Sequence, residues 1–356
     1  MFNLRKSRTQ AKLIVIFAFI FLLYNEFVVY ILTSIDWPPF MQCGARNKNC
    51  LKVLFVADPQ IIGEVHEDKW FSGVARWDSD NFIKKNFELA VEKFKPEAVV
   101  FLGDVMDEGS IAGEEEFSRY LSRLKSIFLE NDKLQYIWIP GDNDIGGEGF
   151  EKVSASKLLQ FHDTFGHENP VPLNGINFIK VNRLIHEKPQ GKWTEKLSNR
   201  TNVVISHMPL LLAPGIYSKT IINQLNPSVI FSAHEHKSFS IKMNKFLSGQ
   251  KTVTHITKAD KKVKRYRIGG DVIHEFIVPT CSYRMGVEES GFGAAVINGY
   301  GSYLDYTVLW LPSRLQTLRN YLYFTCILII SILLNASCLC FRRLRRFKLK
   351  SRSLSN

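Results

Sequence analysis

The sequence contains no internal repeat of fixed period and no low-complexity tract, although it has 22 glycines and 13 prolines. The first absence excludes a repeat architecture, and the second leaves no segment of strongly biased composition. A third absence is that of acidic residues at both ends. Residues 1–12 contain four lysines and arginines and residues 342–356 contain seven, with no Asp or Glu in either segment. Hydrophobic residues make up 46% of the 356, which is enough for the core of one domain.

The formal charge of +12 comes almost entirely from these two ends, which carry 11 positive charges. Apart from Glu26 in the first apolar run, the remainder has 35 basic and 33 acidic residues. This near balance argues against nucleic acid as a partner and makes a nuclease the least favoured function. One basic cluster remains, at residues 258–267, and we expect it to be a solvated loop.

Two apolar runs adjoin the basic ends, at residues 13–32 and 321–341. Each is about as long as a helix that crosses roughly 30 Å of hydrocarbon. The first is too long for the apolar core of a signal peptide, and the small residues of a cleavage site are missing. We therefore expect two uncleaved transmembrane helices. Residues 1–12 and 342–356 would then be cytoplasmic basic tails, and residues 33–320 a domain in the lumen.

Other features agree with a lumenal domain. Asn199-Arg200-Thr201 is an acceptor sequence for N-glycosylation. Cys43 and Cys50 lie close together after the first apolar run, where an oxidising compartment would allow a disulfide. Asn25 and Glu26 are polar residues inside that run, and an acid there is by default a functional hypothesis. Alternatively, Glu26 reaches the membrane interface or pairs with a polar group of the second helix.

Strand-like and helix-like patterns alternate in the central region. Residues 80–94 and 114–128 have the apolar spacing of helices. Five apolar runs of strand length each precede a residue that can bind metal: 52–57 before Asp58, 98–102 before Asp104, 136–139 before Asp142, 202–205 before His207, and 229–232 before His234. This alternation predicts an α/β fold, in which ligands gather at the carboxyl ends of the strands. Residues 239–308 contain further β-rich stretches, which we expect to form the second sheet.

The chemistry of these strand ends points to a metal centre. The ordered set is Asp58-Pro59-Gln60, Gly103-Asp104-Val105-Met106-Asp107, Gly141-Asp142-Asn143-Asp144, His207 and His234-Glu235-His236. Mixed carboxylates and imidazoles suit Mn, Fe or Zn. His234 and His236 are one residue apart, so on an extended segment their side chains point to the same side and can serve neighbouring ions. Two such ions can clamp a phosphate and activate water.

This ordered series resembles the calcineurin-like metallophosphoesterase superfamily, whose pattern runs D-x-H, G-D-x-x-D, G-N-H-D/E, a lone His and G-H-x-H. The resemblance covers about residues 51–236. It implies a four-layer α/β sandwich, with two central mixed sheets flanked by helices, between the two transmembrane helices. It also implies two divalent metal ions, with Mn favoured and Fe or Zn as alternatives. Carried over by position, Asp104 bridges both ions, Asp58 and His236 hold the first, and Asp142, His207 and His234 hold the second.

Three residues depart from the family pattern. Gln60 stands where the pattern has a metal-binding His, and its amide oxygen would be a weaker ligand. Asp142 takes the usual Asn position and remains a good ligand. Asn143 takes the position of a His near the metals, where it can donate a hydrogen bond to phosphate but cannot act as a general acid. A shifted alignment would instead make Asn143 the ligand. We assign catalytic roles to Asn143 and Asp104.

A narrower resemblance is to the membrane branch of this superfamily that trims glycosylphosphatidylinositol (GPI) anchors. It rests on the two spans, Asn25-Glu26, Asp58-Pro59-Gln60 and the segment Ala75-Arg76-Trp77-Asp78. It implies a phosphodiesterase that removes an ethanolamine-phosphate side branch from the second mannose of the anchor, aiding transport of GPI-anchored proteins from the endoplasmic reticulum to the Golgi. Membranes of this early secretory pathway would be its location, and the sorting machinery there is a candidate partner.

The residues leave several alternatives open. Arg76 is a candidate clamp for phosphate, or else an ordinary surface or ion-paired arginine. Trp70 and Trp77 could line a groove for sugar or lipid, or simply pack in the core. The protein could instead be a lumenal phosphomonoesterase, or a non-catalytic membrane factor that keeps its metals for structure. Gln60 and Asn143 give the last reading some force.

Overall fold

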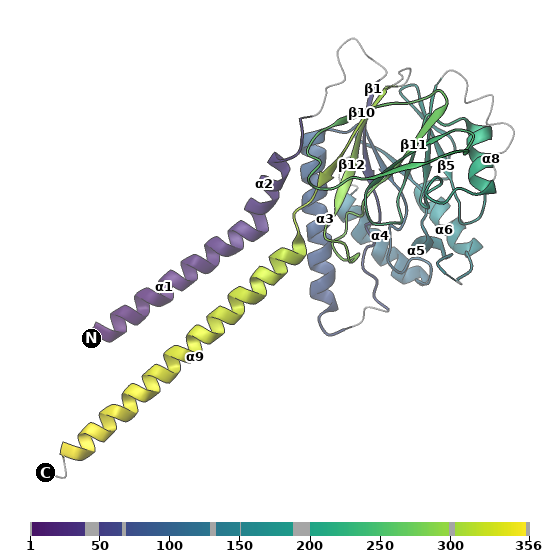
Figure 1. Ribbon diagram of the computed structural model, residues 1–356. Helices are drawn as coiled ribbons and strands as arrows, with labels where there is room; N and C mark the ends of the chain where they lie inside the picture. Colours follow the sequence, from purple (N-terminus) through teal and green to yellow (C-terminus); the bar gives the residue numbers. More distant parts are fainter. Residues whose placement is uncertain are drawn as a thin grey trace. The chain divides into compact units, whose positions relative to one another are not determined.

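The computed structural model describes residues 2–39, 50–65, 69–128, 133–149, 151–187, 200–298 and 303–353. The chain divides into two compact units, Met1–Pro312 and Ser313–Asn356. The first contains two β-sheets with their covering helices, and the second is formed by α9 (Arg314–Ser353) (Figure 1). Cys50 is disulfide-bonded. Its predicted partner Cys43 and the predicted glycosylation residue Asn199 lie outside the described residues.

The first sheet has six strands in the order β10-β13-β12-β1-β2-β3. Neighbours among β1, β2 and β3 are parallel, and the pairs β1–β12, β12–β13 and β13–β10 are antiparallel. The strands are β1 (Cys50–Val56), β2 (Ala98–Phe101), β3 (Gln135–Trp138), β10 (Lys264–Arg267), β12 (Gly291–Asn298) and β13 (Tyr303–Trp310). Burial is almost continuous along β1, β2 and β12, as expected for strands covered on both faces.

The second sheet has seven strands in the order β4-β5-β6-β7-β11-β8-β9. Its centre, β5-β6-β7-β11, is parallel, and the outer pairs are antiparallel. The strands are β4 (Val171–Leu173), β5 (Ile176–Val181), β6 (Thr201–Ser206), β7 (Val229–Ser232), β8 (Phe239–Asn244), β9 (Thr252–His255) and β11 (Val272–Ile277). Both sheets are therefore mixed, as predicted.

The prediction that residues 239–308 form the second sheet is wrong for part of that range. β10, β12 and β13 belong to the first sheet, where β12 lies beside β1. The second sheet is built instead around β6 and β7, with β8, β9 and β11 added to it. The apolar pattern shows that β12 is buried, but it does not show which strand pairs with it. Part of the expected loop at 258–267 is also a strand, β10, whose charged side chains remain in solvent.

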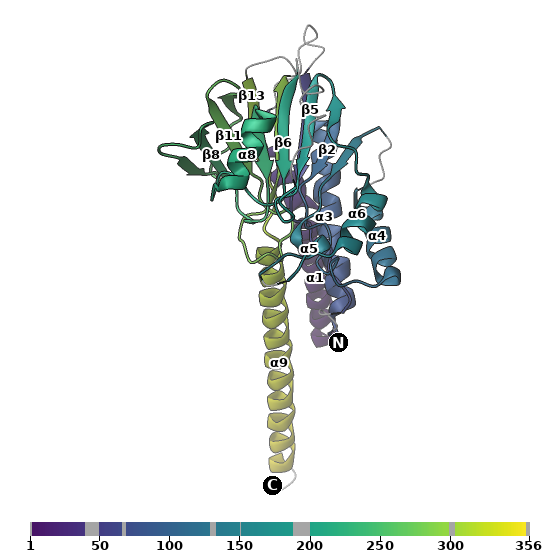
Figure 2. The same cartoon turned by 90° about the vertical axis from the view of Figure 1, so that its right-hand side faces the viewer.

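Helices cover the outer face of each sheet (Figure 2). One apolar cluster joins the first sheet to α3 (Ser72–Phe94), α4 (Glu114–Phe128) and α6 (Ala155–Phe165). A second fills the space between the sheets, where the Phe55 and Phe231 rings stack with their centroids 3.9 Å apart. A third joins the second sheet to α8 (Ile216–Leu225). The order helix, sheet, sheet, helix confirms the predicted four-layer α/β sandwich.

The first helical segment consists of α1 (Phe2–Leu23), a π-helical turn (Tyr24–Val28) and α2 (Val29–Ile35). Its final part packs on the sandwich, because Tyr30 is buried in the first apolar cluster and the Trp37 indole N–H donates to the Trp310 carbonyl at 2.9 Å. The Glu26 carboxylate pairs with the Lys85 ammonium of α3 at 3.1 Å. Neither alternative suggested by the sequence named this partner.

Both terminal helices contain long apolar stretches. Within the described residues, Lys12–Ile35 has a mean hydropathy of 2.3 and Arg314–Leu334 one of 1.6. By length and composition, each is able to cross a membrane.

Candidate metal centre

Five strands bring the predicted ligands to one edge of the sandwich. β1, β2 and β3 end just before Asp58, Asp104 and Asp142, while β6 and β7 end just before His207 and His234. Within each sheet these strands are parallel, so their carboxyl ends lie on the same side. The two sheets thus supply three carboxylates and two imidazoles to one place.

His207 lies at the middle of this centre. Its Nε2 is 2.8 Å from Asp142 Oδ1 and 3.5 Å from Asp104 Oδ1, and its Nδ1 is 3.8 Å from Asp58 Oδ1. His234 Nδ1 is 3.2 Å from Asp142 Oδ1. Asp142, His207 and His234 form one group, and Asp58, Asp104 and His207 form another, each with its potential ligand atoms within 4.8 Å of one another. His207 is therefore common to both groups.

The His207 ring is oriented by a main-chain contact. Its Nδ1 is 2.8 Å from the carbonyl oxygen of Leu102. Because a carbonyl only accepts, Nδ1 carries a proton and donates it, so Nε2 is the nitrogen that faces the carboxylates. Histidines that bind metal commonly have their second nitrogen fixed in this way.

Asp58 gives the clearest sign that the centre is built for a cation. The residue is completely buried, and neither carboxylate oxygen has a hydrogen-bond partner among the described residues. A buried carboxylate without partners is costly unless a cation or a proton neutralises it. Burial raises the pKa of Asp58 to about 8, against the opposing attraction of His207. The residues present therefore fit divalent metal ions.

The other groups show the same competition between burial and charge. Burial also raises the pKa of Asp104, again against the attraction of His207. Burial acts to raise the pKa of Asp142, but hydrogen bonds from His207 and His234 outweigh it, and that pKa is lowered. Burial acts to lower the pKa of His207, but Asp104, Asp142 and Asp58 raise it to about 10. Without metal, the centre therefore holds protons at neutral pH.

Gln60 lies at the centre, but as a donor. Its side-chain Nε2 donates to Asp104 Oδ2 at 3.1 Å, and its main-chain N–H donates to the Asp104 carbonyl at 3.0 Å. The main-chain N–H of Asn143 donates to the other oxygen, Asp104 Oδ1, at 3.0 Å. Gln60 and Asn143 thus hold the Asp104 carboxylate in place from both sides.

The remaining predicted residues lie farther from these contacts. His236 is in neither group of potential ligands. Its main chain is nevertheless connected to that of Asp58 through Thr280. Thr280 N donates to the His236 carbonyl at 3.3 Å, and Thr280 Oγ1 donates to the Asp58 carbonyl at 2.8 Å. The Asn143 side chain makes no hydrogen bond with the described residues. Arg76 Nη1 donates to the Gly63 carbonyl at 3.5 Å, in the segment that follows Gln60. Roles for His236, Asn143 and Arg76 stay predictions.

Sequence reasoning missed two supporting carboxylates. Asp144 is buried and accepts main-chain N–H groups of Val105, Met106 and Gly141 at 2.9–3.2 Å, which ties the loop after β2 to the one after β3. Glu275 of β11 accepts from the main chain of two residues in the loop that follows His207. The acidic fourth position of Gly141-Asp142-Asn143-Asp144 was a signal for Asp144, whereas nothing in the sequence marked Glu275.

The backbone at the centre is strained. Asp58, Gln60, Asp104, His234 and His236 all have positive φ, between 41° and 71°. Residues other than glycine are uncommon in this left-handed region, and each such residue costs about 1–2 kcal/mol. Strain of this kind is typical of functional sites.

Comparison with known proteins is consistent with this centre. Residues 51–238 match the family model described as calcineurin-like phosphoesterase. The chain is 28% identical to mouse Metallophosphoesterase 1 over 171 residues, which is 47% of this chain and 41% of the mouse protein. It is 25% identical to the Caenorhabditis elegans Metallophosphoesterase 1 homolog over 274 residues, which is 65% of this chain and 72% of that protein. The match thus spans less than half the length of the mouse relative.

Solved structures with a similar fold are more distant. Purple acid phosphatase PPD1 from yellow lupin covers 73% of this chain over 52% of its own, with 10% identity and a TM-score of 0.45. At that score the likeness carries no weight of its own.

Proposed function

The chain belongs to the calcineurin-like phosphoesterase family, and from that premise we propose that it is a metal-dependent phosphodiesterase acting on a membrane-linked substrate. The observation that supports this most strongly is the arrangement of Asp58, Asp104, Asp142 and His234 around His207. These residues would hold two divalent ions, with Mn favoured, which would supply positive charge for a phosphate and lower the pKa of a water molecule.

The chain's own residues then position the reaction. Asp104 is held by Gln60 and by the Asn143 main chain, so its carboxylate cannot rotate away from the centre. The Asn143 amide, which is partly exposed, is free to donate to a phosphate oxygen. It has no acidic proton at neutral pH, so the proton for the leaving group comes from water or another residue.

The start of α3 supports a lipid-linked substrate. Trp70 is 96% exposed and Trp77 65% exposed, so neither packs in the core. Exposed tryptophans are typical of surfaces that meet the membrane interface. Arg76 lies beside Trp77 and contacts the segment that leads out of the metal centre. The Glu26–Lys85 ion pair joins the same helix to the first apolar segment.

Our specific proposal is that the substrate is the GPI anchor. The enzyme would remove ethanolamine phosphate from the second mannose in the lumen of the early secretory pathway, with both termini in the cytoplasm. GPI-anchored proteins would then be its substrates, and the sorting machinery between the endoplasmic reticulum and the Golgi its candidate partner. This rests on the sequence resemblance to the anchor-trimming branch, together with the two apolar helices.

The test uses the full-length chain in detergent, loaded with Mn. Hydrolysis of a chromogenic phosphodiester is measured beside that of its monoester, for the wild type, Asp104→Asn and His234→Ala. Matched controls are Asp163→Asn and His167→Ala, because both residues are exposed and lie outside the centre. We expect diester turnover that both centre variants lose and both controls keep.

Two results would contradict the proposal. Faster turnover of the monoester would favour a phosphomonoesterase. Bound metal without turnover of either ester, or of a GPI glycan carrying ethanolamine phosphate, would favour a non-catalytic factor. If the diester is turned over, release of ethanolamine phosphate from that glycan tests the specific substrate.

A further inference from the structure

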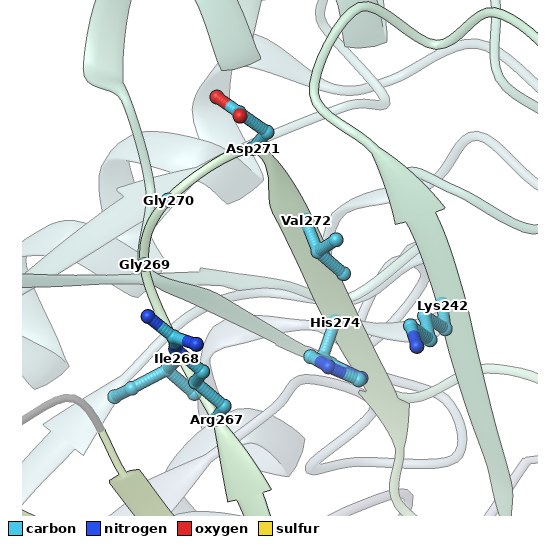
Figure 3. Close-up of a pocket in the computed structure, with 8 residues that line it drawn as sticks. All are labelled: Lys242, Arg267, Ile268, Gly269, Gly270, Asp271, Val272 and His274. Carbon is cyan, nitrogen blue, oxygen red and sulfur yellow. The ribbon is translucent and has the colours of Figure 1, made fainter.

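A polar cavity of about 450 Å³ opens beside the turn that joins β10 to β11 (Figure 3). Lys242 of β8, Arg267 of β10 and His274 of β11 line it. β11 is parallel to β7, whose carboxyl end leads to His234, and His274 lies near the amino end of β11. The cavity is therefore at the opposite end of the second sheet from the metal centre.

His274 is a buried side chain with one unsatisfied ring nitrogen within the described part of the chain. Its side chain points to the same face of β11 as that of Phe276, which belongs to the apolar cluster between the sheets. His274 is 8% exposed, and its Nδ1 has no hydrogen-bond partner among the described residues. The rings of Tyr266 and Phe276 pack beside it. This atom has almost no accessible surface, so any hydrogen bond from the ring to a ligand in the cavity would come from the other nitrogen, Nε2.

Two cations share the cavity with His274. Lys242 is directly opposite His274 in the β8–β11 ladder, and Arg267 ends β10 on the facing sheet. Within the described parts of the chain, neither Lys242 nor Arg267 forms an ion pair or a side-chain hydrogen bond. By contrast, Lys264 and Arg265 on the same strand pair with acids at 2.8 Å and 2.7 Å. The two cations that line the cavity are thus left without acids.

The rest of the lining does not neutralise this charge. Asp271 is at the rim, and Figure 3 shows its carboxylate pointing away from Arg267, Lys242 and His274. Gly269 and Gly270 form the adjoining wall, and open space lies next to both of them. Burial, with the nearby Lys242 charge, lowers the pKa of His274 to about 4. At neutral pH the imidazole is therefore an uncharged group with one N–H to donate.

We propose that this cavity binds a phosphate group, as a site separate from the metal centre. Lys242, Arg267 and His274 come from three strands and approach from different sides. A tetrahedral phosphate can accept from all three, whereas a carboxylate has only two oxygens to offer. The planar guanidinium of Arg267 matches two phosphate oxygens at once. The phosphate could be free in solution or carried by the headgroup of a lipid or sugar.

The test measures binding of inorganic phosphate by calorimetry, with full-length protein in detergent after chelation of metals. Chelation removes the ions through which phosphate would bind the metal centre. The double variant Lys242→Gln with Arg267→Gln should bind phosphate about a hundredfold more weakly or not measurably, since each charge-assisted hydrogen bond contributes about tenfold or more. The matched control, Lys219→Gln with Lys262→Gln, removes the same charge from exposed positions and should bind as the wild type does.

A second variant guards against a general charge effect. His274→Phe keeps both cations but removes the N–H, and it should also weaken binding. Phosphate that binds the cation double variant as tightly as the wild type would overturn the proposal, as would no binding by the wild type at millimolar phosphate. Glycerol 3-phosphate identifies the source: tighter binding than inorganic phosphate indicates a headgroup, and equal binding indicates free phosphate. Because the metal centre is not involved, this result is independent of the proposed activity.

Discussion

Removing the metals should make the stability of the protein fall as pH rises from 7 to 8. The reason is that the folded, metal-free centre keeps protons which the unfolded chain has released. Burial raises the pKa of Asp58 to about 8 from 3.8. Burial acts to lower the pKa of His207, but the neighbouring carboxylates raise it to about 10 from 6.5. Between pH 7 and 8 the folded state therefore binds more protons than the unfolded state.

The size of the effect follows from proton linkage. Each extra proton in the folded state lowers the free energy of unfolding by about 1.4 kcal/mol per pH unit of increase. Because Asp58 and His207 share one site, we count one retained proton for the pair and expect the free energy of unfolding to fall by at least this amount. His236 and His274 have lowered pKa values, and their contributions lie below pH 6.5, outside this window. Bound metals displace the protons, so the loaded protein should not show the fall.

Thermal or denaturant unfolding at pH 7 and pH 8, with chelator or with Mn, measures this directly. A loss of 1.4 kcal/mol corresponds to a lower Tm by a few degrees, about 2–4 °C per kcal/mol. Asp58→Asn should show a shallower fall than the wild type in the chelated state. If the chelated wild type is equally stable or more stable at pH 8, the electrostatic reasoning about the centre is wrong.

Three further predictions test other parts of the structure. Gly141→Ala would place a Cβ atom 2.1 Å from Asp104 Oδ1. We therefore expect fewer bound metal ions by elemental analysis and a free energy of unfolding lower by about 1–3 kcal/mol. In the control Gly215→Ala, the added Cβ enters open space and should change neither quantity. Glu26→Gln removes a partly exposed ion pair with Lys85 and should lower stability by about 1 kcal/mol or less; a larger loss in a double-mutant cycle would show a stronger coupling. Trp70→Ser should leave Tm unchanged, because the side chain is 96% exposed, and should lower binding to lipid vesicles; unchanged vesicle binding would remove Trp70 from the membrane surface.

The sequence was most informative where burial and pattern agree. The predicted helix at 114–128 has the bounds of α4, and the predicted strand at 229–232 has those of β7. β9 (Thr252–His255) lies in the β-rich range 239–308 but could not be singled out there, because every one of its side chains is exposed. This strand is recognised only by its hydrogen-bonded pairing with β8. The spacing of apolar residues in the sequence does not predict that pairing. α3 begins eight residues before the predicted start, at Ser72, because its first turns bury no apolar side chain.

At the metal centre, the order of residues along the chain predicted that the ligands follow the ends of strands. It did not predict which ligands contact one another. The structure brings together Asp58, Asp104, Asp142, His207 and His234. That His207 is common to both groups follows from the way the two sheets face each other, which is a property of the whole sandwich. The support from Glu275 arises in the same way, since it reaches main-chain groups 64 and 65 residues away.

The left-handed backbone at the strand ends limits which substitutions this protein can accept there. A glycine at any of these positions would relax the chain, and a search for stabilising substitutions would tend to select it. At Asp58, Asp104, His234 and His236, however, that glycine would delete a predicted ligand. Gln60 is the exception, because it has the same backbone conformation without being assigned to a metal. Gln60→Gly therefore separates the cost of the left-handed backbone from the value of the hydrogen bond to Asp104. A higher Tm in this variant would show that the strained backbone costs the protein more stability than that hydrogen bond returns.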